Sequence, residues 1–341
     1  MQKTEVLTWL VRPFAAGLIA GLLVLLAPLM LIGEGEAEKV PQLLPASPSV
    51  SVPPQNEPKE SWDEQQLVRI LLESGEVEEM TMAEYLWRVV AAEMPASFEQ
   101  EAMCAQAVCA RTYTLWKRET SAHQNADLCD DSSCCQAYIT EEEAAQRWGD
   151  LTAAYTAKIA SAVEETDGQI LVYEGEPIQA VFFSSSVSAT EDAAAVWGSS
   201  LPYLVSVASP EGEEVPNYHS TVVLTSKELK ALVAGSGLGV KLSGESSEWI
   251  DNVSYTASGR VAELELGGVT LSGGAARSLF GLRSACFEVE EDDGVFTFSV
   301  TGYGHGVGMS QYGANAMAAA GSTWQEIVTH YYTGITIQEG M

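Results

Sequence analysis

The sequence is poor in basic residues: its 341 residues include 17 Lys and Arg against 47 Asp and Glu, a formal net charge of −30 at pH 7. A chain this acidic lacks the basic surface of a nucleic-acid-binding protein, and its field repels polyphosphates. Cysteine is also scarce, and six cysteines are too few for a disulfide framework in a chain of this length. A composition of 46% hydrophobic and 19% charged residues excludes a wholly disordered chain, a collagen and a coiled-coil rod.

Several common catalytic motifs are missing. The sequence contains no H-E-x-x-H, S-x-x-K, G-x-S-x-G or P-loop pattern. The glycine-rich run 302–308 alternates its glycines, so it does not match the G-x-G-x-x-G fingerprint of dinucleotide binding. A glycine at every second position instead allows the backbone to pass close to something bulky, such as a sugar ring.

One long uncharged segment, residues 14–32, has the length and composition of a transmembrane helix. At about 1.5 Å per residue it reaches roughly 28 Å, close to the hydrocarbon thickness of a bilayer. Lys3 and Arg12 precede it and three glutamates follow, which predicts a cytoplasmic tail at 1–13 and an exported remainder. The alternative is a cleaved signal peptide, but the run is longer than a usual signal core and no Ala-x-Ala site ends it.

Residues 33–62 hold six of the 13 prolines and read as a semi-extended linker. The remainder, 63–341, fits one large domain in which helices precede strands and helices follow them, an order that predicts an α+β fold. Strands are expected at 67–72, 77–80, 169–173, 178–183, 221–225, 261–266 and 295–301, and two helices divided by Gly321 and Ser322 are expected at the end.

Glu93 lies at a corner between two further helices that the sequence predicts. Thr81 with Glu84 and Ser97 with Gln100 match the capping-box pattern that begins helices, the second running to about residue 117, and a proline follows two residues after Glu93. A carboxyl group at a helix C-terminus among apolar neighbours has a raised pKa, which suits a general acid near neutral pH. The alternative is an ordinary surface glutamate.

Four possible metal ligands lie within thirteen residues: His123, Cys129, Cys134 and Cys135. One imidazole and three thiolates complete a tetrahedral zinc site, whereas an exported protein also favours a disulfide. The adjacent Cys134 and Cys135 make a simple pairing awkward, which favours zinc. The other three cysteines, Cys104, Cys109 and Cys286, read as buried core residues.

Two further features leave structural and functional interpretations open. Arg111 follows small residues on the second helix, where a guanidinium indicates either a buried ion pair or a substrate clamp. Ser184 and Ser186 lie where a strand is expected to end, and hydroxyls there either bond sugars or form a plain serine-rich turn.

A set of stretches spans most of the folded part: V-A-A-E-M-P at 90–95, E-A-M-C-A-Q-A at 101–107 leading to A-R-T at 110–112, the run 182–191, V-W-G at 196–198 with P-Y-L at 202–204, G-H-G-V-G-M-S-Q-Y-G-A at 304–314, and H-Y-Y-T-G at 330–334. As a set they resemble the stage II sporulation protein D (SpoIID) family and its amidase-enhancer relatives. The resemblance runs from about residue 67 to the end and includes the single anchor.

The resemblance implies a membrane-anchored lytic transglycosylase that cuts peptidoglycan glycan strands during engulfment in an endospore-forming bacterium. Its implied partners are a sporulation amidase, which removes the stem peptides first, and a membrane scaffold of the engulfment machinery. The catalytic glutamate of the family falls on Glu93. Some clostridial members carry zinc beside the active site, which implies a structural Zn²⁺ on the His123 cluster.

In such an enzyme one carboxyl group suffices, because the C6 hydroxyl of muramic acid attacks its own anomeric carbon. Glu93 then protonates the glycosidic oxygen and takes the hydroxyl proton as the 1,6-anhydro ring closes. The residues expected to hold the glycan are Gln106, Arg111, Ser184, Ser186, His305, Gln311 and Tyr312. The sequence departs from the family pattern at 103–106, where it reads Met-Cys-Ala-Gln, at Phe183 and at Val187-Ser188, and these departures leave the contacts of the serine loop open.

Two other functions are compatible with these residues. The first is a non-catalytic glycan-binding module that activates an N-acetylmuramoyl-L-alanine amidase. The second is a hydrolase with water as nucleophile, which needs a second catalytic carboxylate; Glu191 is the nearest candidate.

Overall fold

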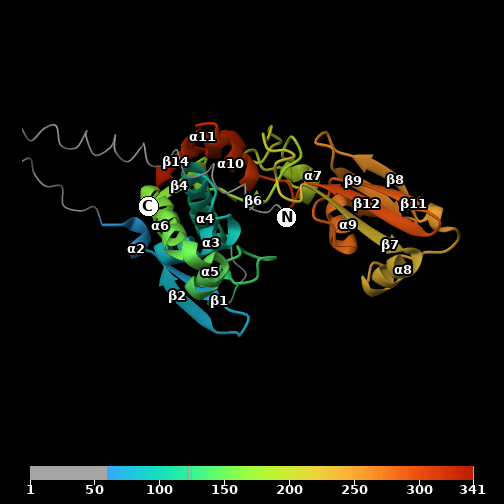
Figure 1. The fold of residues 1–341 in the computed structure, drawn as a ribbon, viewed down its shortest axis with the longest axis horizontal. Coiled ribbons are helices and arrows are strands. Elements are labelled where there is room, and N and C mark those ends of the chain that lie inside the picture. The colour runs from blue at the N-terminus through green and yellow to red at the C-terminus, as the bar shows by residue number, and fades with distance from the viewer. Residues whose placement is uncertain (1–59, 121–122, 124, 341) are drawn as a thin grey trace, which may run out of the picture. The chain divides into compact units, whose positions relative to one another are not determined.

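A computed structural model describes residues 60–340 of the chain apart from 121, 122 and 124. The expected transmembrane segment, the cytoplasmic tail and nearly all of the linker lie outside the described residues. Within the described part, no helix is both long and apolar enough to span a bilayer. The described residues fold as a mixed α+β unit, as the order of elements in the sequence predicts (Figure 1).

The helices of the described residues are α2 (Trp62–Gln65), α3 (Met82–Glu93), α4 (Gln100–Thr120), α5 (Glu141–Trp148), α6 (Thr152–Glu165), α7 (Ala193–Trp197), α8 (Ser226–Gly235), α9 (Gly273–Phe280), α10 (Gln311–Ala319) and α11 (Trp324–Tyr331). The strands are β1 (Leu67–Leu71), β2 (Val77–Thr81), β3 (Leu128–Cys129), β4 (Gln169–Tyr173), β5 (Glu176–Pro177), β6 (Phe182–Phe183), β7 (His219–Thr225), β8 (Ile250–Tyr255), β9 (Val261–Leu266), β10 (Val269–Ser272), β11 (Phe287–Asp292), β12 (Val295–Thr301), β13 (Met309–Ser310) and β14 (Thr336–Glu339).

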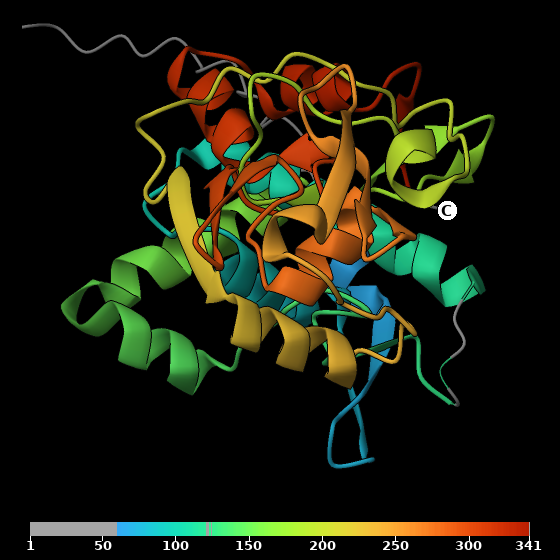
Figure 2. The same ribbon diagram turned by 90° about the vertical axis from the view of Figure 1, so that its right-hand side faces the viewer.

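Helix α4 lies at the centre of the first of two hydrophobic cores. Its residues 102–114 are all buried, and many of them are alanine, so that other helices approach its backbone closely on every side. Helices α3, α6, α10 and α11 surround it (Figure 1). The β1–β2 hairpin extends from this part of the unit, as both ribbon views show (Figures 1 and 2).

The second core belongs to the segment between β6 and β13. Two antiparallel three-stranded sheets, β11-β12-β7 and β10-β9-β8, pack there with α8 and α9. Trp249, Phe296 and Phe298 fill this core. Strands β6 and β13 pair in parallel on either side of the inserted segment, with Met309 opposite Phe182. This pairing returns the chain to the first core, and α10 begins directly after it.

Most of the expected elements are confirmed, and two are wrong. Ser97 does not begin α4: the Phe98 N–H donates to the Pro95 carbonyl in a tight turn, and the helix begins three residues later, at Gln100. The strand expected at 178–183 is mostly absent: β5, which pairs with β4, ends at Pro177, and only 182–183 form a strand, β6, which pairs with β13. The short strand β14, which pairs with β4, was not expected.

The alternating glycines of 302–308 approach the protein itself. Gly302, Gly304, Gly306 and Gly308 all have positive φ, and a Cβ at Gly304 would lie 2.6 Å from that of Phe183. A Cβ at Gly308 would collide with the Val181 carbonyl oxygen. The bulky neighbour is therefore chiefly the segment around β6, and the expectation that a sugar ring requires these glycines is wrong.

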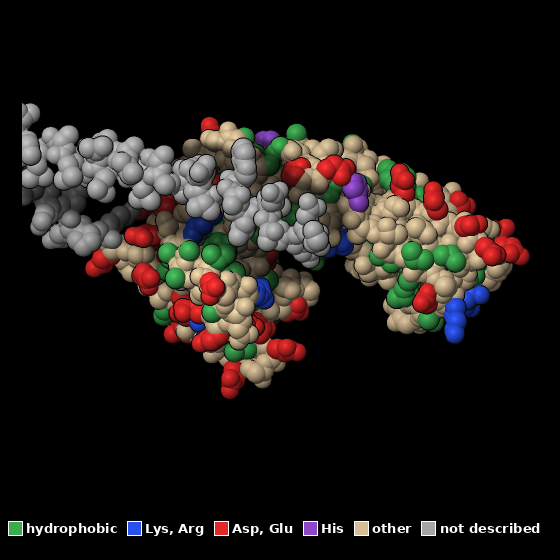
Figure 3. Space-filling model, viewed as in Figure 1, with side chains coloured by type: hydrophobic (Ala, Val, Ile, Leu, Met, Phe, Trp, Pro, Cys, Tyr) green, Lys and Arg blue, Asp and Glu red, His purple; other side chains and the backbone are tan. Residues whose placement is uncertain are grey.

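Acidic side chains are spread over the folded unit. Figure 3 shows Asp and Glu over both its helices and its strands, with Lys and Arg at only a few places. Several cations are neutralised locally, since Arg69, Arg88 and Arg118 each form an ion pair with a carboxylate. A cation without such a partner is a local exception to the sign of the surrounding surface.

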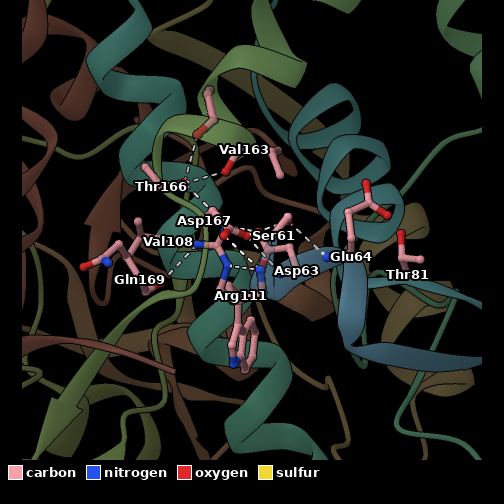
Figure 4. Close-up of polar contacts among 12 residues, drawn as sticks. Ser61, Asp63, Glu64, Thr81, Val108, Arg111, Val163, Thr166, Asp167 and Gln169 are labelled. Atoms are coloured by element: carbon pink, nitrogen blue, oxygen red, sulfur yellow. Dashed lines mark hydrogen bonds and ion pairs between the residues drawn. The ribbon is translucent and has the colours of Figure 1, made fainter. Parts of the chain in front are cut away.

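The folded unit begins earlier than the sequence indicates. Ser61 and Trp62, assigned above to the linker, donate hydrogen bonds to the Asp167 carboxylate, and Ser61 caps α2 (Figure 4). Within α2, Asp63 is buried, and its carboxylate accepts hydrogen bonds from Nε and Nη2 of Arg111, at 2.7 and 2.5 Å. The linker therefore ends no later than residue 60, since 61 and 62 belong to the fold.

Candidate active site

Glu93 is the last residue of α3, and local sequence signals hold it at a corner. Thr81 caps the start of the helix by accepting the Glu84 N–H, and the buried face of Leu86, Val89 and Val90 packs into the first core. After Met94 the chain turns at Pro95, which cannot continue the helix. The Glu93 side chain is therefore directed by a helix end that is anchored on the core.

The Glu93 carboxyl group is half-buried and held by two donors. Its Oε1 accepts the Ala137 N–H at 3.0 Å, and its Oε2 accepts Nε2 of Gln311 at 3.3 Å. Burial raises the pKa of Glu93, and the two hydrogen bonds offset this only in part. A carboxyl group with a raised pKa remains protonated closer to neutral pH, as a general acid requires.

Gln311 is positioned in turn by Gln106. Gln311 is the first residue of α10, and its amide nitrogen Nε2 lies 3.5 Å from Oε1 of Gln106 on α4. Gln106 is fully buried, so it supports Gln311 and does not reach a substrate. Of these two expected glycan contacts, the structure brings Gln311 to Glu93 and places Gln106 behind it.

Two hollows meet at Glu93. The larger has a volume of about 740 Å³ and is lined by Glu93, Ser184, Trp197, Arg277 and His305 among others. The smaller has about 430 Å³. Residues that line both hollows are Ala92, Glu93, Ser184, Tyr303 and Gln311. An extended ligand that occupies both hollows therefore passes the Glu93 carboxyl group.

The lining of the hollows contrasts with the rest of the protein. Although the chain has 47 acidic residues, Glu93 is the only Asp or Glu among the described residues that lines either hollow. Two large aromatic side chains there are unusually accessible: Trp197 is 41% exposed and Tyr303 is 43% exposed. Exposed aromatic faces suit the apolar faces of sugar rings.

His305 lines the larger hollow, but both of its ring nitrogens are already bonded. Nε2 lies 3.1 Å from the Phe182 carbonyl oxygen, and Nδ1 accepts the Val307 N–H at 3.1 Å. This pattern requires the neutral tautomer with hydrogen on Nε2, and burial lowers the pKa of His305 to about 4. His305 therefore joins the glycine-rich run to β6 and offers its ring face to the hollow.

The remaining expected contacts divide into two groups. Ser184 lines both hollows and Tyr312 lines the smaller one, where its ring packs against Phe98. Ser186 is fully buried and bonded to Arg260 and to the Ala189 carbonyl, so its expected glycan contact is wrong. The serine loop presents only its first residue to the site.

The expected glycan contact of Arg111 also differs from what the structure shows. Of the two interpretations of Arg111, the structure has the buried ion pair: the side chain has no exposed surface and is occupied by Asp63 and by the Gln169 carbonyl (Figure 4). It lines neither hollow. Its expected role as a glycan contact is therefore wrong.

Glu191, the candidate second carboxylate, does not share the groove with Glu93. It is 4% exposed, accepts the hydroxyls of Thr256 and Ser258, and lines neither hollow. A carboxylate committed in this way to its neighbours is a structural acceptor. The described residues therefore offer one carboxyl group for chemistry in this groove.

The four expected metal ligands converge. One ligand atom from each of His123, Cys129, Cys134 and Cys135 lies within 4.8 Å of all the others. The Cys129 and Cys135 sulfurs are 3.6 Å apart, and His123 Nε2 lies 3.3 Å from Cys135 Sγ. A sulfur–sulfur distance of 3.6 Å is too long for a disulfide, and all described cysteines are free thiols.

The shorter of these distances are close to those expected around a tetrahedral zinc ion. Metal–sulfur bonds of about 2.3 Å and a metal–nitrogen bond of about 2.0 Å place tetrahedral ligand atoms roughly 3.5–3.8 Å apart. The cluster also borders the site, because Cys134 and Cys135 line the larger hollow. Two residues after Cys135, the chain supplies the Ala137 N–H to Glu93. The cluster and the carboxyl group therefore share one short loop.

The remaining cysteines are not ligands. Cys104 and Cys109 are fully buried on α4, as expected. Cys286 is only half-buried and donates to the Gly259 carbonyl, so its assignment to the core is wrong. It lies directly before β11, which begins at Phe287.

Comparison with known proteins decides the family. The family model described as "Stage II sporulation protein" matches residues 73–173. Over 267 residues the chain is 41% identical to stage II sporulation protein D of Bacillus subtilis, which covers 77% of this chain and 76% of that protein. The chain belongs to the stage II sporulation protein D family. The corresponding protein of Bacillus amyloliquefaciens is 40% identical over the same share of each chain.

The chain is also similar to a protein that is more distant in sequence. The chain is 31% identical to the amidase enhancer of Bacillus subtilis, across 73% of this chain and 39% of that longer protein. Both Glu93 and the His/Cys cluster lie inside the part matched by the family model, whereas Gln311 lies outside it. The groove of this family member is thus completed by a segment far from the matched core.

Four groups of this family member's site were missed in the sequence. They are Trp197, Arg277, Arg283 and Tyr303. Trp197 stands in a stretch that carried the family resemblance, but an exposed tryptophan cannot be told from a buried one by its neighbours. The other three belong to the inserted segment or its end, and no local pattern connects them with Glu93.

Proposed function

We propose that this protein is a lytic transglycosylase that cleaves peptidoglycan glycan strands, with Glu93 as its acid and base. One observation carries the proposal: a single carboxyl group lies where two hollows meet, in a groove otherwise free of described acidic residues. Hydrolytic glycosidases normally use two carboxyl groups about 5–9.5 Å apart. A reaction that needs one carboxyl group fits this groove better.

The proton transfers follow from that geometry. Protonated Glu93 gives its proton to the glycosidic oxygen, and the bond between this oxygen and the anomeric carbon breaks. The C6 hydroxyl of the same muramic acid residue attacks the anomeric carbon and gives its proton to the Glu93 carboxylate. No water is consumed, one product carries a 1,6-anhydro ring, and the enzyme returns to its starting state.

The neighbours of Glu93 support each stage. Ala137 N–H and the Gln311 amide hold the carboxyl group at a fixed rotamer, so that proton transfer needs little reorganisation. Both donors also stabilise the carboxylate that exists between the two transfers. Trp197 and Tyr303 offer exposed rings for the sugars on the two sides of the scissile bond.

We infer a zinc ion on His123, Cys129, Cys134 and Cys135. Bound there, it would act as a structural cross-link, since four protein ligands leave no open position for a substrate or water. The chain's own contribution is the loop from Cys135 to Ala137, which the cross-link would hold against Glu93.

The cellular setting is also a proposal. Membership of a sporulation family supports a role in sporulation, and the apolar segment 14–32 with its charge asymmetry supports an anchored, exported domain at the septal and engulfing membrane. Protease added to intact protoplasts should remove the domain and spare the N-terminal tail. A protected domain would contradict this orientation.

The alternative function is a non-catalytic activator of an N-acetylmuramoyl-L-alanine amidase. The similarity to a protein named amidase enhancer supports it, although that match covers only 39% of the enhancer. Such a module would bind glycan in the same groove and leave the strand intact. Because an activator and an enzyme would both bind glycan in this groove, analysis of the reaction products is needed to distinguish them.

The deciding experiment is mass spectrometry of the products from the purified protein and denuded glycan strands. The proposed reaction gives fragments lighter by one water than hydrolysis products, with 1,6-anhydromuramic ends. Glu93→Gln should fold and bind glycan but cleave about 10²–10⁴-fold more slowly, because Gln keeps the size and loses the proton. Glu191→Gln should retain anhydro products.

Three outcomes would overturn the proposal. Intact strands with wild-type protein would leave the activator function, and reducing ends alone would indicate hydrolysis. Wild-type cleavage by Glu93→Gln with unchanged anhydro products would remove Glu93 from the mechanism.

A further inference from the structure

The groove holds cations as well as its single carboxyl group. Arg277, on α9, lines the larger hollow, and Arg283, in the turn that follows, lines the smaller one. Both belong to the inserted segment that faces Glu93 across the groove. The chain around them has a net charge of −30, so two cations beside one carboxyl group reverse the general sign of the surface at this place.

Neither guanidinium has a carboxylate partner in the part of the chain that the structure describes. Among the described residues, no carboxylate forms an ion pair with Arg277 or Arg283, although four other arginines form such pairs. Arg147, the other cation at the smaller hollow, is exposed and interacts with Glu143 on the same helix.

Arg277 is held in place by its inner nitrogen. Its Nε donates to the carbonyls of Leu282 and Arg283, at 3.3 and 3.1 Å. Its two Nη atoms have no hydrogen-bond partner among the described residues. The planar fork of the guanidinium is therefore fixed at one edge and open at the other, the geometry that suits a bidentate carboxylate.

Arg283 lies against an aromatic face of the groove. Its guanidinium carbon is 4.1 Å from the centroid of the Tyr303 ring, and its Nε is buried without a hydrogen-bond partner in the described structure. That nitrogen is covered by the protein, whereas the Arg283 side chain also lines the smaller hollow, where a ligand can meet it. Tyr303 lines both hollows, so it joins the surroundings of the two arginines.

We propose that Arg277 and Arg283 are the residues of the groove that bind the free lactyl carboxylates of muramic acid residues on the two sides of Glu93. The inference rests on the proposed glycan cleavage and assigns two substrate-binding residues of that site. When a stem peptide is present, the lactyl carboxyl group is an amide and carries no charge at that atom. Removal of the peptide exposes a carboxylate that a guanidinium recognises.

The test separates recognition from cleavage by using Glu93→Gln protein, which binds without turnover. Its affinity is measured for denuded glycan with free lactyl carboxylates and for the same glycan with those groups methyl-esterified. The free acid should bind about 10-fold or more tightly, since a charge-assisted pair is replaced by a neutral contact. The difference should shrink as salt is raised.

Substitutions then locate the carboxylate sites. In the Glu93→Gln background, Arg277→Gln and Arg283→Gln should each weaken binding of the free acid by about 10-fold and change binding of the ester little. Arg277→Lys keeps the charge without the fork and should fall between. Lys227→Gln, which removes an exposed cation of α8 outside both hollows, is the matched control and should change neither affinity.

The comparison of acid with ester needs no arginine variant, so it remains informative if either variant is unstable. Equal affinity of Glu93→Gln for the two glycans would overturn the inference and leave the proposed cleavage untouched. Equal losses for acid and ester in the arginine variants would also overturn it. Failure to bind either glycan would remove the proposed function together with the inference.

Discussion

At the scale of single residues, the behaviour of Glu93 is a balance between burial and two hydrogen bonds. Burial disfavours its carboxylate, whereas the Ala137 N–H and the Gln311 amide favour it. The first effect is the larger, and the pKa of Glu93 is raised. The same two donors keep the deprotonated form from being prohibitively costly, which a group that gives and then takes a proton requires.

A pH dependence of stability follows from this balance. A raised folded-state pKa means that Glu93 contributes its full stability below the pKa of an unfolded glutamate and loses it as the pH rises through the folded value. The free energy of unfolding of wild type, measured relative to Glu93→Gln, should therefore decrease from the ordinary carboxyl range up to the raised pKa and then level off. Denaturant titrations at a series of pH values measure it.

The rate of glycan cleavage should also depend on the protonation of Glu93. The kcat/KM for glycan cleavage should fall as the pH rises above the raised pKa of Glu93, because the free enzyme then lacks its acid. A cleavage rate that stays constant across the interval where the stability difference appears would contradict the assignment of Glu93 as the acid.

At the scale of elements, the important unit is the loop that begins at β3 and ends at Tyr138. It carries three of the four cluster residues and then the N–H that holds Glu93. Gln136 lies between them, buried, and donates to Tyr85, to the Ala110 carbonyl and to Thr114. Local order at the cluster is therefore transmitted to the acid over two residues.

Metal removal should test this unit. Protein purified without added metal is expected to hold about one zinc per chain, and Cys134→Ser should lower both the zinc content and the melting temperature. Chelation should also slow cleavage, because the loop that donates to Glu93 loses its cross-link. Elemental analysis and thermal unfolding are the measurements, and Cys286→Ser, which alters a thiol outside the cluster, is the control.

Zinc content near zero in freshly purified protein, with a disulfide at Cys129 by mass spectrometry, would defeat the metal assignment. Acidification should release the metal, since thiolate ligands must lose it when they are protonated.

A feature of the structure can be predicted from the sequence when the residues that specify it lie close together in the chain. The Glu93 corner and the His123 cluster were predictable, because capping residues, a proline and four ligands lie within a few turns of each other. Arg277 and Tyr303 were not, because β6 and β13 bring them to Glu93 only after an insertion with its own core. Arg111 was misassigned because its partner, Asp63, lies 48 positions earlier in the chain, just after the predicted linker, and no local pattern connects the two.

At the scale of the whole molecule, the described unit is held at its beginning by a buried ion pair. Asp63 on α2 and Arg111 on the central helix α4 are both nearly inaccessible, so each depends on the other for compensation of its charge. Asp167 adds a second attachment by accepting from Ser61, Trp62 and Asp63. Residues 61–63 are therefore part of the fold's stability.

Truncation should reveal this attachment. A chain that begins at residue 67 should lose about 3–5 kcal/mol of unfolding free energy relative to one that begins at residue 58, because Arg111 is left as an unpaired buried charge. Arg111→Met should restore part of that loss in the shorter chain and destabilise the longer one. Urea denaturation measures both. Equal stability of the two lengths would show that the domain begins after α2.

The partners Glu93 and Gln311 are 218 positions apart in the chain. A polypeptide is made from its N-terminus, so the acid exists long before the amide that holds it and before the second wall of the groove. Pairing of such distant segments waits until nearly the whole chain has emerged. A ribosome that stalls, or a chain that is cut short, therefore leaves a protein with its acid but without an assembled site, and the destructive activity proposed here is withheld until synthesis is almost complete.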